Sequence, residues 1–219
     1  IEQERSPFVV IEGLDGAGTT TQCELLADRL RREGESAAVT REPSDGPVGA
    51  LIRQMLSMRV VAPDQQGGVQ AVDEDVLALL FAADRLDHVD TEIEPAVGTG
   101  TMVVSDRYYH SSLAYQGEGE GPESFDFDWV RTLNERALRP DLTVFLEVSV
   151  DTSLKRMRDR NSRDIYENRE KLEALQWRYA AVVEQLEREG EPIETIDAEQ
   201  SIEEVHEAVW TAVRPLLEG

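Results

Sequence analysis

The segment from residue 8 to residue 22 constrains the fold of this chain more than any other part of it. An apolar run over residues 8–11 is typical of a buried strand, and glycines follow it before a helical pattern begins at Thr19. A glycine-rich turn between a strand and a helix directs backbone N–H groups inward, and the helix N-terminus adds positive potential. The segment therefore predicts a cradle for phosphate groups at the end of a strand.

The residues of this turn follow the spacing of a nucleotide-binding P-loop, with one departure. Gly13 and Gly18 stand at the two glycine positions, and Thr20 supplies the hydroxyl expected to reach a Mg²⁺ ion carried with the nucleotide. Thr19 stands where the pattern has a lysine. The residues expected to contact the nucleotide phosphates are Gly13, Gly16, Ala17, Gly18, Thr19, Thr20 and Thr21.

Length and composition limit the class of protein. A chain of 219 residues and 24.5 kDa is long enough for one α/β domain with a sizeable core. No apolar stretch approaches the roughly 18 residues of a membrane span, and no leader pattern opens the chain, so we expect a cytoplasmic protein. The single cysteine, Cys23, excludes an internal disulfide and is expected to be a small packed residue.

The charge balance is strongly acidic. The chain has 45 Asp and Glu against 22 Lys and Arg, for a formal net charge of −23, and Lys155 and Lys171 are its only lysines. Such a surface repels nucleic-acid phosphates and anionic membranes, which argues against both as partners. High acidity with little lysine favours a protein that works in concentrated salt, where screening relieves self-repulsion, over an ordinary acidic enzyme.

Strand-like and helix-like segments alternate along the chain. Strands are predicted at 8–12, 37–41, 102–105, 142–147 and 193–196, and helices at about 19–33, 47–57, 73–90, 126–137, 151–159, 168–188 and 201–217. This order predicts one α/β domain over 1–219, with a mostly parallel sheet covered on both faces and ligands at the carboxyl ends of its strands. The segments 57–73 and 117–127 are expected to be surface loops. Ser201 and Glu204 form a predicted capping box at the last helix.

Three further motifs place polar side chains near that edge of the sheet. Thr40-Arg-Glu-Pro43 follows the second predicted strand, and Asp106-Arg107 follows the third. An aspartate at a strand end beside a phosphate cradle suits a Mg²⁺-directed carboxylate, and an arginine can bridge phosphates with two donors. Phe81 and Arg85 lie four positions apart on one helix face, which suits stacking on a nucleobase and hydrogen bonding to it. Alone, each motif also fits a plainer interpretation, as a charged turn or a core aromatic beside a surface ion pair.

A basic cluster stands out in this acidic chain between residues 155 and 163. Its members are Lys155, Arg156, Arg158, Arg160 and Arg163. A solvated helix face is the usual explanation of such a cluster, but its concentration here favours a lid that closes over polyphosphate and excludes water. The three histidines show no metal-ligand spacing, so no metal is expected beyond Mg²⁺.

Taken together, the motifs resemble those of thymidylate kinase, a family of P-loop nucleoside-monophosphate kinases. The resemblance covers nearly the whole chain in the family's order, over residues 8–22, 40–43, 80–85, 106–108, 114–117 and 139–142. It implies a three-layer α/β/α fold with a five-stranded parallel sheet, a helical lid at about 156–168 and a homodimer. The implied substrates are ATP and dTMP, with Mg²⁺ carried by ATP.

The resemblance also implies roles for residues of the dTMP site. Phe81 would stack on thymine and Arg85 would reach its carbonyl edge, while Asp15 would accept a hydrogen bond from the sugar 3′-hydroxyl. Arg53 and Arg107 would hold the acceptor phosphate. The other implied residues are Ser112 and Gln116 in the base pocket, Tyr115 where a ribose 2′-hydroxyl would sit, and Glu42 with Asp106 near Mg²⁺.

On the ATP side, the resemblance implies an adenine pocket at Asp197 and Ala198. Because the P-loop offers no arginine, the catalytic arginine would come from the lid, where Arg160 and Arg163 are candidates with Arg156 behind them. The implied catalytic residues are then Asp15, Asp106, Arg107, Arg160 and Arg163.

The presence of Thr19 in place of the P-loop lysine has three possible explanations. A lid arginine replaces the missing charge, or a bound monovalent cation does, or the chain binds nucleotides without turnover and acts as a regulator. A kinase of the same fold with another acceptor, such as dUMP, is a further alternative. The leading prediction is transfer of the γ-phosphoryl of ATP to dTMP, which gives dTDP and ADP.

Overall fold

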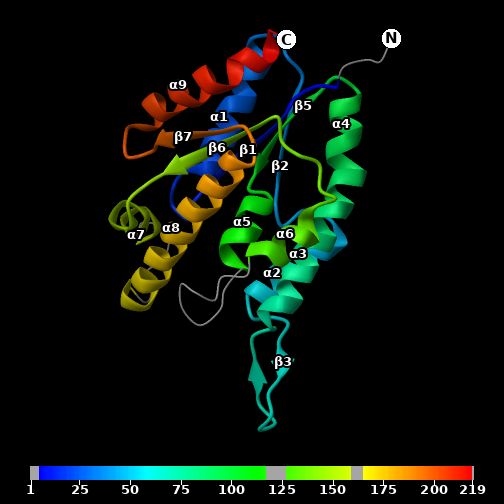
Figure 1. Ribbon diagram of the computed structural model, residues 1–219, viewed down its shortest axis with the longest axis vertical. Helices are drawn as coiled ribbons and strands as arrows, with labels where there is room; N and C mark the ends of the chain where they lie inside the picture. The colour runs from blue at the N-terminus through cyan, green and yellow to red at the C-terminus, as the bar shows by residue number, and fades with distance from the viewer. Residues whose placement is uncertain (1–4, 117–126, 159–164, 219) are drawn as a thin grey trace.

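A five-stranded parallel sheet forms the centre of the molecule (Figure 1). The computed structural model describes residues 5–116, 127–158 and 165–218. The strands are β1 Phe8–Gly13, β2 Ala37–Arg41, β5 Met102–Asp106, β6 Leu142–Glu147 and β7 Ile193–Asp197, in the spatial order β2-β5-β1-β6-β7. This confirms the predicted α/β fold and all the predicted strands of its sheet.

Strand β1 suits the middle of the sheet because the side chains of residues 8–11 are apolar on both faces. Val9 and Ile11 pack into one buried cluster, while Phe8 and Val10 pack into another on the opposite face. A strand buried on both faces reads as a continuous apolar run, which is the pattern that the sequence carries here. β1 pairs with β5 on one side and with β6 on the other, so the glycine-rich loop emerges at the centre of the carboxyl edge.

Helices cover both faces of the sheet. They are α1 Thr19–Arg32, α2 Pro47–Leu56, α3 Glu74–His88, α4 Glu94–Gly98, α5 Tyr109–Tyr115, α6 Phe127–Asn134, α7 Val150–Arg158, α8 Ile165–Arg188 and α9 Ile202–Val213. Helices α1 and α9 pack together over the Val9 face, and α5 and α8 pack together over the Phe8 face. A short 3₁₀ turn, Arg214–Leu217, replaces the end of the helix predicted over 201–217, since Pro215 interrupts it. The predicted capping box of Ser201 and Glu204 is confirmed.

The prediction for residues 57–73 is wrong in part, because this segment is not entirely a loop. Strands β3 Ala62–Pro63 and β4 Val69–Gln70 pair as a hairpin that extends away from the body of the molecule (Figure 1). Asp64 closes its turn by accepting hydrogen bonds from the backbone N–H groups of Gln66 and Gly68. The helix predicted over 73–90 also continues further, through a π turn, Val89–Ile93, into α4.

The sequence pattern does not predict helix α5. Its N-cap residue, Tyr108, provides no side-chain cap, and its sequence is rich in tyrosine, serine and histidine, which are weak helix formers. The carboxylate of Glu12, which belongs to β1, accepts hydrogen bonds from the backbone N–H groups of Tyr108 and Ser111 instead. The cap therefore comes from a residue distant in the chain, where a local pattern cannot find it.

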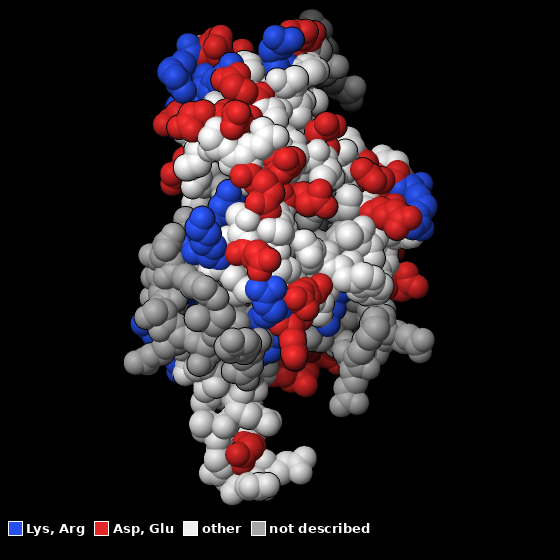
Figure 2. Space-filling model, turned by 90° about the vertical axis from the view of Figure 1, so that its left-hand side faces the viewer, with Lys and Arg blue, Asp and Glu red and all other residues white. Residues whose placement is uncertain are grey.

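The surface and the interior agree with the composition. Acidic side chains are spread over the face shown in Figure 2, with fewer basic ones between them. Cys23 is fully buried, as predicted. In the described parts of the chain, no helix combines the length and the apolar character needed to cross a membrane.

Candidate active site

Three connections meet at the carboxyl edge of the sheet. The glycine-rich loop follows β1, Glu42 follows β2, and Asp106 ends β5. Parallel register places Ile11 and Arg41 on either side of Asp106, and the backbone N–H of Glu42 donates to the carbonyl oxygen of Asp106 at 3.1 Å. Motifs that are about 30 to 90 residues apart in the sequence thus share one edge, which is where ligands collect in open α/β sheets.

The glycine-rich loop adopts a backbone that its glycines allow. Gly16 and Gly18 have φ angles of +85° and +100°, in the left-handed region that side chains disfavour. A Cβ atom on Gly16 would also lie 2.9 Å from the carbonyl oxygen of Ser153 on α7. Gly18 is the N-cap of α1 and makes no side-chain cap, so the N–H groups of the first helical turn remain suited to an anion.

Thr20 and Asp106 form the candidate Mg²⁺ site. The Thr20 hydroxyl donates to Oδ2 of Asp106. The other carboxylate oxygen, Oδ1, is buried and has no hydrogen-bond partner within the described residues. Hydroxyl and carboxylate oxygens are the ligands that Mg²⁺ prefers, so this pair fits the ion. Nowhere in the described chain do three or more His, Cys, Asp or Glu side chains gather in a metal-binding group.

Thr19 begins α1 and is 7% exposed. Lys155 is exposed on α7, and its neighbour, Arg156, contacts the loop. The Arg156 guanidinium donates to the carbonyl oxygens of Gly16 and Ala17 at 3.3 Å each, and to that of Ala198 at 2.9 Å. Arg156 therefore joins the loop to the turn after β7.

A cavity of about 250 Å³ opens beside the loop. Of the residues predicted for ATP, it is lined by Gly16, Ala17, Gly18, Thr21, Arg156 and Ala198. Asp197 does not line it: its carboxylate accepts from the backbone N–H of Glu199 and so shapes the turn after β7. Arg160 and Arg163 lie outside the described residues. We call this the donor cavity.

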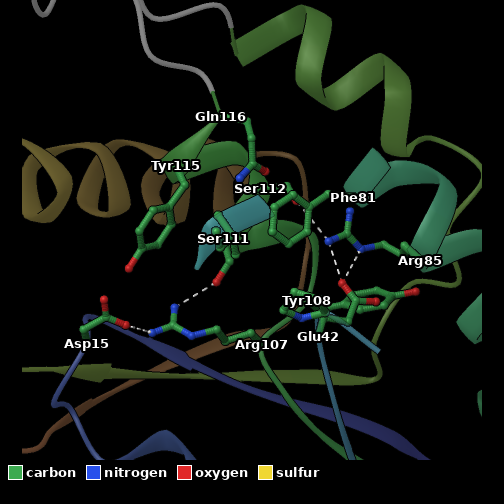
Figure 3. A pocket seen from close by; sticks show the side chains of 12 residues that line it. Asp15, Glu42, Phe81, Arg85, Arg107, Tyr108, Ser111, Ser112, Tyr115 and Gln116 are labelled. Carbon is green, nitrogen blue, oxygen red and sulfur yellow. Dashed lines mark hydrogen bonds and ion pairs between the residues drawn. The ribbon is translucent and has the colours of Figure 1, made fainter. Parts of the chain in front are cut away.

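A second cavity, of about 280 Å³, lies between the loop and helices α3 and α5 (Figure 3). We call it the acceptor cavity. Of the residues predicted for dTMP, it is lined by Asp15, Glu42, Phe81, Arg85, Arg107, Ser112, Tyr115 and Gln116. Arg53 stands beside it, where the guanidinium donates to the carbonyl oxygens of Pro43 and Ser44.

Arg85 occupies one end of the acceptor cavity and is 1% exposed. Its Nε donates to Glu42 at 2.8 Å and its Nη2 to the Ser112 hydroxyl at 3.0 Å, while Nη1 donates to Asn134. Phe81 lies one helical turn earlier on the same face of α3 (Figure 3). A fixed guanidinium beside an aromatic ring suits a flat heterocycle that carries a carbonyl group.

Arg107 occupies the other end, next to the glycine-rich loop. Its Nη2 donates to Asp15 at 2.6 Å, and its guanidinium carbon lies 5.7 Å from the centre of the Tyr115 ring. Burial raises the pKa of Tyr115, so its phenol stays protonated at neutral pH. A guanidinium, a carboxylate and a phenol therefore surround the end of the acceptor cavity that lies beside the glycine-rich loop.

Several side chains that hold this site were not predicted from the sequence. Glu12, Asn134 and Tyr179 are buried, and each contacts a residue of the acceptor cavity. Glu12 had a detectable signal, since a carboxylate in an otherwise apolar strand requires partners. His88, three residues after Arg85, also contacts Glu42. For Asn134 and Tyr179, the neighbouring sequence contains no pattern that indicates a role in the site.

Comparison with known proteins agrees with this geometry. The family model for thymidylate kinase matches residues 11–209. A probable thymidylate kinase of Thermococcus onnurineus (strain NA1) is 37% identical over 208 residues, which cover 94% of this chain and 96% of that protein. The thymidylate kinase of Exiguobacterium sibiricum is 40% identical over 200 residues, 90% of this chain and 88% of that protein. That of Thermomicrobium roseum is 38% identical over 218 residues, 96% and 95% respectively. This chain, with its P-loop fold and its two cavities beside the glycine-rich loop, belongs to the thymidylate kinase family of enzymes.

Proposed function

We propose that the protein transfers the γ-phosphoryl group of ATP to dTMP and releases dTDP and ADP. One observation carries the proposal: a single cavity has a base receptor, Arg85 with Phe81, at one end and an anion receptor, Arg107, at the other. The second end adjoins a glycine-rich loop built to bind phosphates. A nucleoside monophosphate placed between the receptors would present its phosphate to a donor on the loop.

The base end favours a pyrimidine with a carbonyl group. Arg85 can only donate hydrogen bonds, so it favours the 4-carbonyl of thymine or uracil over the 4-amino group of cytosine. Phe81 offers its ring for stacking, and Ser112 and Gln116 line the wall beside it. Tyr115 narrows the place proposed for the sugar, which favours a deoxyribose over a ribose.

The transfer itself requires positioning and charge more than covalent chemistry. In the proposed arrangement, Asp15 accepts a hydrogen bond from the sugar 3′-hydroxyl, and Arg53 and Arg107 bind the acceptor phosphate. The backbone N–H groups of the glycine-rich loop bind the β- and γ-phosphates of ATP. The acceptor oxygen then faces the γ-phosphorus in line with the bond that breaks.

Thr20 and Asp106 would hold Mg²⁺ with the donor phosphates. The unpartnered Oδ1 of Asp106 supports this role. When bound, the ion would neutralise the negative charge on the phosphoryl oxygens, whose distribution changes during the transfer.

The missing P-loop lysine must be compensated if transfer is fast. Loss of one preorganised cationic donor costs about 10²–10³ in rate by analogy with oxyanion sites. We propose that Arg160 and Arg163 supply this charge from a lid at about 156–168. Arg156, which already contacts the loop, anchors that lid at α7.

An ADP-release assay tests the proposal directly. The purified protein is given ATP, Mg²⁺ and one of dTMP, dUMP, dCMP or dGMP, in dilute buffer and in molar KCl. We expect dTMP to give the highest kcat/KM and dCMP to give very little ADP. Tight binding of ATP without ADP release in any mixture would contradict the proposal and favour a regulatory nucleotide-binding protein.

The acidic surface and two helices support further parts of the proposal. We propose a salt-adapted, cytoplasmic enzyme that binds no nucleic acid, because a net charge of −23 repels polyanions and is screened in concentrated salt.

We also propose a homodimer formed through α2 and α3, which pack together and expose Leu51, Val76 and Leu79. Activity against KCl concentration and sedimentation equilibrium test these two points.

A further inference from the structure

A fully buried carboxylate lies directly behind the glycine-rich loop. Glu12, the residue before Gly13, is 0% exposed. Its Oε1 accepts from the backbone N–H groups of Tyr108 and Ser111 at 2.8 and 3.0 Å, which caps α5. Its Oε2 accepts from the Ser111 hydroxyl at 2.8 Å and from the Tyr179 hydroxyl at 3.2 Å. Glu12 therefore ties the end of β1 to both α5 and α8.

The same two hydroxyl groups contact Arg107. The Ser111 and Tyr179 oxygens lie 2.8 Å apart, and each accepts a hydrogen bond from Nη1 of Arg107 at 3.0 Å. Burial raises the pKa of Tyr179 well above its ordinary value, so its hydroxyl keeps the proton that it donates. Two neutral hydroxyls thus connect a buried carboxylate to the guanidinium at the loop end of the acceptor cavity.

The backbone of Arg107 is held as firmly as its side chain. Its φ angle of +71° lies in the left-handed region, which is uncommon for a residue other than glycine. The Arg107 N–H donates to the carbonyl oxygen of Ile11 at 3.0 Å, and the Ser105 hydroxyl donates to the Arg107 carbonyl at 2.7 Å. An unfavourable backbone conformation persists at a functional site when the surrounding contacts hold it in place, and the two hydrogen bonds to the Arg107 backbone do so here.

We propose that Glu12, Ser111 and Tyr179 act as one set of positioning residues, which fix Arg107 for the acceptor phosphate. Within the described residues, the contacts of Arg107 leave its Nε–H and one Nη2–H without a partner. A guanidinium held at Nη1 has little freedom left to lose when those donors bind a phosphate. This inference rests on the proposed function, because that function gives Arg107 an acceptor phosphate to bind.

The variant Tyr179→Phe tests the hydroxyl with little change in packing. The Tyr179 ring packs against Tyr115 and Phe145, contacts that phenylalanine keeps. Tyr109→Phe is the matched control, because the Tyr109 hydroxyl also donates to a carboxylate, that of Glu191 at 2.7 Å, but does not contact Arg107. Calorimetry compares the binding of dTMP with that of thymidine, which lacks the phosphate, and kinetics gives kcat/KM for dTMP and for ATP.

We expect Tyr179→Phe to weaken dTMP binding and to lower kcat/KM for dTMP about tenfold, while thymidine binding changes less than twofold. Glu12→Gln, which removes the charge behind both hydroxyls, should have the larger effect, about a hundredfold. Tyr109→Phe should leave all of these quantities within about twofold. Thermal melting of each variant shows which effects come from loss of the folded state.

Two results would overturn the positioning role while the proposed function stands. In the first, Tyr179→Phe weakens the binding of dTMP and of thymidine equally. In the second, its binding and kinetic constants cannot be distinguished from those of Tyr109→Phe. If the parent phosphorylates another monophosphate instead of dTMP, the proposed function is wrong, and the same comparison with that nucleotide and its nucleoside decides the positioning role. A parent that binds no nucleoside monophosphate would refute both.

Discussion

The two cavities at the carboxyl edge of the sheet are lined by different chemical groups. In the acceptor cavity, Arg85 and Arg107 are each held by several side chains that come from distant parts of the sequence. In the donor cavity, the loop presents backbone groups, and Arg156 is held by three carbonyl oxygens. One site therefore depends on side-chain identity and the other mainly on the course of the main chain.

This difference explains why the substitution at residue 19 leaves the loop intact. The conformation of the loop depends on Gly16 and Gly18 and on its contacts with α7, none of which requires a lysine side chain. A comparable change in the acceptor cavity would leave a buried charge without its partner. Substitutions should therefore be more costly on the acceptor side, and the predictions below begin there.

The largest effect is expected from Arg107→Met. This variant keeps an unbranched side chain of similar length but removes the charge from the end of the acceptor cavity beside the loop. We expect kcat/KM for dTMP to fall about 10³-fold, equivalent to about 4 kcal/mol, with KM for ATP nearly unchanged. Arg188→Met, which breaks an exposed ion pair with Glu184, is the control and should retain parental activity. A fall of less than tenfold for Arg107→Met would place the acceptor phosphate elsewhere.

Glu42→Gln should have the next largest effect, this time on stability. Glu42 and Arg85 form an ion pair of 2.6 Å in which both side chains are at most 3% exposed. Removing one partner leaves the buried guanidinium uncompensated, so the free energy of unfolding should fall by about 3 kcal/mol. Urea denaturation measures this. Glu184→Gln, on the surface, should change the same quantity by less than about 0.5 kcal/mol, and equal losses in the two variants would refute the argument.

The sequence predicted the sheet and the donor loop well because both have local signals. A continuous apolar run marks β1, and the spacing of Gly13 and Gly18 marks the loop. The predicted roles of the acceptor-cavity residues depended instead on the resemblance to a family. Phe81 and Arg85, read alone, also fit an ordinary helix that packs on the core.

The supporting contacts could not be predicted, because they join residues far apart in the chain. Asn134 reaches Arg85 across 49 positions, and Tyr179 reaches Glu12 across 167. No periodicity or short motif encodes such pairs. Helix α5 was missed for the same reason, since its cap is a carboxylate on another element.

Thr19→Lys should sharpen the comparison from the donor side. Restoring an ammonium at the loop adds charge where the β- and γ-phosphates are expected. Because Arg160 and Arg163 are proposed to supply the missing charge already, we expect kcat to rise less than about tenfold, with KM for dTMP unchanged. The assay is run in dilute buffer and in molar KCl. A parent that is inert at every salt concentration beside a fast variant would show that nothing compensates for the lysine. An unchanged kcat would mean that compensation is already complete.

The smallest effect is expected from Ser201→Ala, just outside the donor cavity. Ser201 caps α9 by accepting from the backbone N–H of Glu204, and the next residue, Ile202, lines the cavity and accepts from Gln22. Loss of an N-cap costs about 1 kcal/mol of unfolding free energy, which urea denaturation can resolve. The cap is only one of the interactions of α9, and the other contacts of this helix should keep the main chain of the donor cavity in place. KM for ATP should therefore change less than twofold. A larger change in KM would mean that the donor cavity depends on individual side chains as much as the acceptor cavity does.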